Sequence, residues 1–272
     1  MNSTPHTLRI GSPDLVPDEL RPTTRPLTAG AVRGRWFYFG LSLVLLSIAV
    51  AGFMPSYLIK VSNHSFDLPP IFHVHAGLFF SWLLLNALQA WFVATGRVYN
   101  HRNWGLAGIS LATAMTISIV LLVITGIKLA EAHGMGLPAR RFAYLNISGA
   151  AKFALIFGAA IDCIKRRELH KRLIVIANST VMGAPVGRLV VMAMLPPNLR
   201  VGPPPPLAII LILVLAYFPT YAGMIYDWRT RGRPHPVYLV GLVSMLSGLL
   251  VPVIGRTDAW MNVINHLVLL MG

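Results

Sequence analysis

The chain of 272 residues is 55% hydrophobic and only 12% charged, with a mean hydropathy of +0.65, which is typical of polytopic membrane proteins and excludes a soluble domain. Its formal net charge of +14 does not indicate nucleic-acid binding, because most lysines and arginines lie in short loops between apolar runs, where they set membrane orientation. The single cysteine, Cys163, excludes an internal disulfide and any CxxC metal or redox motif.

The first 34 residues form a polar arm ahead of the first apolar run. They hold five prolines among serines, threonines and charged residues. Such a segment cannot bury enough apolar surface to fold by itself. We therefore predict a disordered arm over residues 1–34, without a secretory signal.

Seven apolar runs follow, each of about 20 residues or more, which is enough to cross a bilayer as a helix. They cover residues 36–58, 71–95, 104–129, 142–163, 173–195, 207–226 and 236–255. We predict an all-α, polytopic transmembrane helix bundle of about seven spans over residues 35–256, with residues 70–195 as its core. Residues 257–272 have apolar side chains at helical spacing but are too short to cross, and we expect them at the outer membrane surface or packed against the bundle.

Loop charge predicts the orientation of the bundle. The arm and the loops after the second, fourth and sixth runs hold fifteen basic residues, whereas the opposite loops hold five. Positively charged loops stay in the cytoplasm. We therefore predict a cytoplasmic N-terminus and a C-terminus outside.

The second run carries a polar stripe. His75, Trp82, Asn86 and Gln89 fall within about 60° of one another on a helix of 100° per residue. A face in contact with lipid has no use for such groups, because unsatisfied polar atoms in hydrocarbon are costly. The stripe should face other helices or a bound group, and the sequence leaves open which.

Histidines lie near both ends of the predicted bundle. His75 is near the outer face, whereas His101 opens the third helix and His170 precedes the fifth, both near the inner face. Paired histidines on facing helices resemble dihaem cytochromes b, whose histidines hold haem iron. His101 and His170 are a candidate pair at one level, but His75 has no mid-helix partner in the third or fifth run. Alternatively, these histidines contact lipid headgroups.

Two cations lie well inside predicted spans. Lys152 is near the middle of the fourth run and Arg188 is in the outer half of the fifth, and Asp162 is the only acid that we place inside a span. Charges inside spans need partners, so the pair suggests an anionic ligand such as a haem propionate, a carboxylate metabolite or a lipid phosphate. Alternatively, Lys152 snorkels and Arg188 bonds carbonyl groups that a helix break at Pro185 releases.

Two motifs occur in order along the chain. The first is formed by His75, Gln89, His101-Arg102 and Gly105, and the second by His170-Lys171-Arg172-Leu173-Ile174 followed by Arg188. Over roughly residues 70–190, they resemble a family of bacterial polytopic membrane proteins that is described as a predicted membrane domain of unknown function. Leu173 and Ile174 stand where the family often has Trp and Met, and Lys171 replaces an Arg. The resemblance implies a multi-pass protein of the bacterial inner (plasma) membrane and carries no activity.

Three hypotheses for function follow. In the first, the core binds haem b and exchanges electrons with quinone; His75, His101 and His170 are candidate iron ligands, Lys152 and Arg188 pair with propionates, and Gln89 donates to a ligand. In the second, Lys152 and Arg188 anchor a small organic anion that is bound or transported. In the third, the chain is a membrane scaffold without a ligand. No hydrolytic or phosphoryl-transfer motif is present, and whether the chain is an enzyme stays open.

Overall fold

The structure, a computed structural model, describes residues 29–65, 67–196 and 203–270, and this part of the chain is helical without a strand. Its elements are α1 (Ala29–Phe53), a π-helical turn η3 (Met54–Leu58), α2 (Ile59–Ser62), α3 (Pro70–Ala94), α4 (Val98–Ala132), α5 (Gly136–Asp162), α6 (Arg167–Val181), α7 (Gly183–Met194), α8 (Pro206–Ala216), α9 (Phe218–Arg231), α10 (Tyr238–Ser247), a 3₁₀ turn η5 (Gly248–Leu250), α11 (Val251–Ile254) and α12 (Asp258–Leu270).

The predicted all-α membrane bundle is confirmed. Five helical stretches of the described chain are long and apolar enough to cross a membrane, and seven are if each of two bent pairs counts as one span. The bent pairs are α6 with α7, at 43°, and the α10–α11 stretch with α12, at 89°. The chain is therefore a multi-pass membrane protein. Most of the predicted arm, residues 1–28, lies outside the described residues, as does most of the proline-rich loop before α8.

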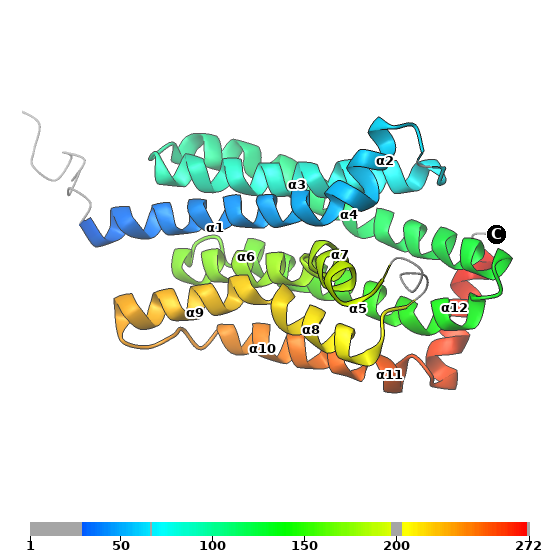
Figure 1. Cartoon of the computed structure of the whole chain (residues 1–272). Coiled ribbons are helices and arrows are strands. Elements are labelled where there is room, and N and C mark those ends of the chain that lie inside the picture. Colours follow the sequence, from blue (N-terminus) through cyan, green and yellow to red (C-terminus); the bar gives the residue numbers. More distant parts are fainter. Residues whose placement is uncertain (1–28, 66, 197–202, 271–272) are drawn as a thin grey trace, which may run out of the picture.

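The helices run back and forth along one bundle axis (Figure 1). α3 packs against α1 and α4, α5 packs against α4 and α6, and α6 in turn contacts α9 and α10. One end of the bundle gathers the start of α1 and the α3–α4, α5–α6 and α9–α10 turns (Figure 1), where Phe37 of α1 stacks on Tyr226 of α9 at 4.0 Å between ring centroids. We call this end the basic end, because these are the segments that carry the excess of lysine and arginine.

A helix break separates α6 from α7 at Met182. The break was predicted, because Pro185 cannot donate a hydrogen bond to the preceding turn. Beside the break, a Cβ on Gly183 would meet nothing within 4 Å, and one on Gly187 would make only ordinary contacts. The close approach is made instead by Gly52 of α1, whose missing Cβ leaves room for the Pro185 backbone.

The C-terminal helix α12 crosses the end of the bundle that is opposite to the basic end (Figure 1). Trp260 donates its indole N–H to the backbone carbonyl of Arg140 at 2.9 Å. The apolar face of α12 covers a second, smaller core formed with α4 and α5. Its buried residues are Val123, Ile124, Ile127, Ala143, Trp260, Ile264 and Val268.

Candidate functional site

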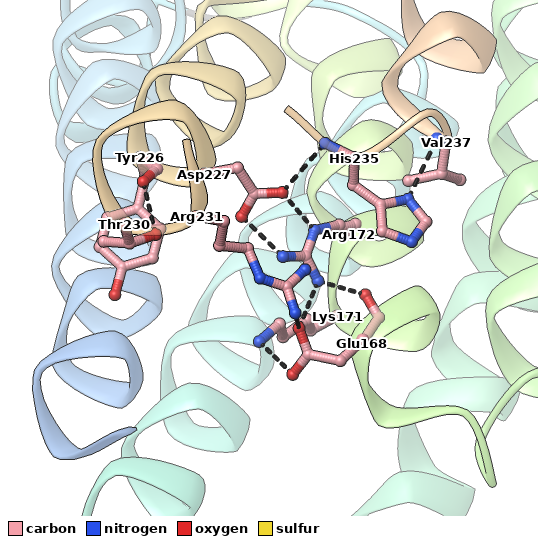
Figure 2. A network of polar contacts seen from close by, with 9 residues as sticks. All are labelled: Glu168, Lys171, Arg172, Tyr226, Asp227, Thr230, Arg231, His235 and Val237. Atoms are coloured by element: carbon pink, nitrogen blue, oxygen red, sulfur yellow. Dashed lines mark hydrogen bonds and ion pairs between the residues drawn. The ribbon is translucent and has the colours of Figure 1, made fainter. Parts of the chain in front are cut away.

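The basic end holds a buried ion pair between Arg172 of α6 and Asp227 of α9 (Figure 2). Two hydrogen bonds join them: Arg172 Nε donates to Asp227 Oδ2 at 2.7 Å, and Arg172 Nη2 donates to Asp227 Oδ1 at 2.6 Å. The side chains are 1% and 0% exposed. Such a two-pronged contact between guanidinium and carboxylate is the geometry that best offsets the cost of removing both charges from water.

Further polar groups extend this pair to the surface (Figure 2). Glu168 accepts a hydrogen bond from Arg172 Nη1 at 2.8 Å and also pairs with Lys171 and Arg231, at 2.7 and 3.0 Å. On the other side, the backbone N–H of His235 donates to Asp227 Oδ2 at 3.2 Å. The network thereby ties the start of α6 to the end of α9 and to the loop before α10.

Sequence reasoning missed this network. It assigned Arg172 to a loop, as one of the basic residues that set membrane orientation, and took Asp162 as the only acid inside a span. In the structure, Asp162 is exposed at the end of α5, whereas Asp227 is fully buried. The available signal was a single acid, Asp227, at the end of an otherwise apolar and aromatic run. Its partner could not be assigned, because Arg172 lies 55 residues away in sequence.

The predicted histidine pair does come together. The rings of His101 on α4 and His170 on α6 lie 6.4 Å apart between centroids, with their planes at 82°. His170 donates its Nδ1–H to the carbonyl oxygen of Ala160 at 2.7 Å, which leaves Nε2 of the same ring with a free lone pair. The His101 ring lies against the backbone carbonyl of Gln89.

Two buried polar atoms, one on His101 and one on the side chain of Gln89, lack partners among the described residues. Neither Nδ1 of His101 nor Oε1 of Gln89 forms a hydrogen bond within the part of the chain that the structure describes. A buried polar atom without a partner costs about 1–3 kcal/mol. Such an atom therefore calls for an explanation, and a water or a ligand that is bound at this place supplies one.

The polar stripe of α3 faces inward, as predicted. Trp82 Nε1 donates to Asn178 Oδ1 of α6 at 2.9 Å, and Asn178 Nδ2 donates to Asn86 Oδ1 at 3.0 Å. Gln89 continues the stripe toward His101, whereas His75, at its other end, hydrogen-bonds through Nδ1 to Ser118 Oγ of α4 at 2.9 Å. His75 thus lies apart from the pair formed by His101 and His170.

The two cations inside spans contact different elements. Lys152 donates to the Ser244 carbonyl and to Ser247 Oγ, both on α10, at 3.2 and 3.3 Å. Arg188 donates to Ser56 Oγ at 3.0 Å and to the Ala184 carbonyl at 3.1 Å. Its guanidinium also lies 4.1 Å from the centre of the Phe53 ring. These partners are neutral, and the roles of both cations toward a propionate or an organic anion stay predictions.

The described residues contain no group of three or more His, Cys, Asp or Glu side chains placed to hold a metal ion. The chain matches no family model, no curated protein and no solved structure. The likeness to bacterial membrane proteins that the two motifs indicate therefore stays a prediction, and the candidate site rests on its geometry.

Proposed function

We propose that the chain is a membrane haem protein that binds b-type haem through His101 and His170 and carries electrons. The observation that supports this proposal is that the two imidazole rings lie 6.4 Å apart between centroids. The two histidines come from different helices and are 69 positions apart in the sequence. Histidine is a common protein ligand of haem iron, and His101 and His170 would hold the iron here.

Two histidines would be enough to hold haem iron here, because the porphyrin itself would supply the remaining ligands. Histidine ligation of this kind would fit electron transfer.

The groups around the two histidines are suited to orienting them as iron ligands. A metal-ligating histidine usually donates its second N–H to a carbonyl or a carboxylate, which fixes the ring, and His170 does so to Ala160. When the haem is bound, it supplies one-electron chemistry. The chain positions the two rings, and Gln89 contributes a polar group beside His101.

A reduced-minus-oxidised visible spectrum of the purified protein, produced with haem supply, tests this proposal. We expect a sharp α-band at about one haem per chain, and we expect His101→Ala or His170→Ala to abolish it. His133→Ala is the matched control, because His133 is exposed in the α4–α5 turn and bonds only a local carbonyl. A blank wild-type spectrum, or a band that survives both substitutions, overturns the proposal. If His75→Ala also abolishes the α-band, His75 is a further candidate ligand of the haem iron.

A further inference from the structure

A shallow, open cleft of about 540 Å³ lies at the basic end of the bundle, beside the α5–α6 turn. Half of its lining is basic. The residues that line it are Lys165, Arg166, Arg167, Glu168, Leu169 and His235.

The positive charge of this cleft is not balanced by the acids around it. Lys165, Arg166 and Arg167 are exposed, and none of them forms an ion pair with a carboxylate among the described residues. The one acid in the lining, Glu168, is already engaged by three other cations. These are Lys171, Arg172 and Arg231.

Neutral donors complete the lining. His235 accepts a hydrogen bond at Nδ1 from the backbone N–H of Val237 at 3.1 Å (Figure 2), so the ring proton is on Nε2, which can donate. Burial and the nearby charge of Arg172 lower the pKa of His235 from its ordinary value, which favours this neutral form. α6 begins at Arg167 without a side-chain cap, and its first N–H groups favour an anion.

The cleft is held open by the buried network described above. The pair of Arg172 and Asp227 fixes α6 against α9, and the contact from the His235 N–H to Asp227 fixes the loop that forms the far wall. The cleft therefore has a frame of paired residues with exposed basic side chains at its rim, which suits a ligand that is small and strongly anionic.

We propose that this cleft binds a phosphate group, carried by an anionic phospholipid headgroup or by a soluble phosphate ester. The position suits both sources. α5 ends at Asp162 and α6 begins at Arg167, so the cleft lies where two spanning helices leave the apolar layer, at the level of headgroups and within reach of the aqueous phase.

The test is thermal unfolding of the full chain in a neutral detergent, at constant ionic strength, with four probes. These are dioctanoyl phosphatidylglycerol, zwitterionic dioctanoyl phosphatidylcholine, glycerol 3-phosphate and inorganic phosphate. The variant is Arg166→Gln with Arg167→Gln. The control is Arg229→Gln with Arg233→Gln, which removes two exposed charges from the same end without touching the cleft.

We expect phosphatidylglycerol, and not phosphatidylcholine, to raise the melting temperature in a saturable way. The apparent Kd should rise about tenfold or more in the cleft variant and about twofold or less in the control, because charge-assisted hydrogen bonds are lost only in the former. Stabilisation by phosphatidylglycerol alone identifies a lipid as the source of the phosphate, and stabilisation by glycerol 3-phosphate or phosphate at similar concentrations identifies a soluble ester. The proposal is overturned if no probe stabilises the wild type, or if both variants lose the effect equally.

Discussion

At the scale of single residues, the pair of Arg172 and Asp227 shows how strongly one charge depends on another. Both side chains are almost fully removed from solvent. Breaking such a pair leaves a buried charge that nothing compensates, which costs far more than the intact pair contributes. The hydrogen bond from the His235 N–H depends on the same carboxylate, so loss of Asp227 also releases the loop before α10.

Asp227→Asn should therefore lower the free energy of unfolding by about 3–5 kcal/mol, measured by thermal or denaturant unfolding in a fixed detergent. Replacement of both partners, Arg172→Met with Asp227→Leu, should recover most of this loss, because no charge is then left without its partner.

Glu168→Gln is the matched control in the same network. The Glu168 side chain is 51% exposed, so its ion pairs are screened by solvent and their loss should cost about 1 kcal/mol or less. Equal destabilisation by Glu168→Gln and Asp227→Asn would contradict the view that burial gives the inner pair its importance.

The residues of the polar stripe could be predicted, and the buried ion pair could not. Trp82 and Asn86 share a helix face by spacing alone, so their inward direction follows from periodicity. The contact of Arg172 with Asp227 depends on how α6 and α9 pack, which no local pattern encodes. The same holds for His101 and His170: their level in the membrane was predictable, whereas their separation is a property of the packed bundle.

At the scale of helices, the break between α6 and α7 packs closely against the neighbouring helix α1. The Pro185 backbone lies so close to Gly52 that any side chain there would overlap its carbonyl group. The sequence indicated the break from the proline. It did not indicate which glycine makes the close contact, because that depends on which helix packs against the bend.

Gly52→Ala should destabilise the protein by about 1–3 kcal/mol, because backbone atoms of Pro185 cannot move aside as a flexible side chain would. Gly183→Ala should leave stability unchanged or raise it slightly, since the added methyl meets open space and alanine favours the helix. Melting temperatures of the two variants under identical conditions give the comparison. Equal destabilisation would contradict the view that the close contact with Pro185 is what requires glycine at position 52.

At the scale of the whole molecule, the basic end gathers charged segments that are distant in sequence (Figure 1). The all-α class and the multi-span bundle were predictable, because apolar runs of sufficient length leave few alternatives in a bilayer. The sharp turns were not predictable: α12 departs by 89° from the stretch before it, and only its packing on α4 and α5 explains that direction.

The excess of basic residues predicts that the basic end faces the cytoplasm. In a Cys163→Ser background, Asn63→Cys should react with a membrane-impermeant maleimide in intact cells. Thr230→Cys should react only after permeabilisation. Both positions are exposed: Asn63 lies in the loop between α2 and α3, and Thr230 lies near the end of α9. The reverse pattern would show that the bundle has the opposite orientation.

The position of α12 also matters during synthesis. α4 and α5 are synthesised first, yet Ile124 and Ile127 are buried in a core that also contains Trp260 and Ile264 of α12. The ribosome adds Trp260 and Ile264 more than a hundred residues later. Until then these apolar side chains face lipid or other proteins, a condition in which incomplete chains misassemble. A premature stop before Asp258 would leave every one of the longer helices intact, and we expect quality-control proteases to remove such a product because its second core cannot close.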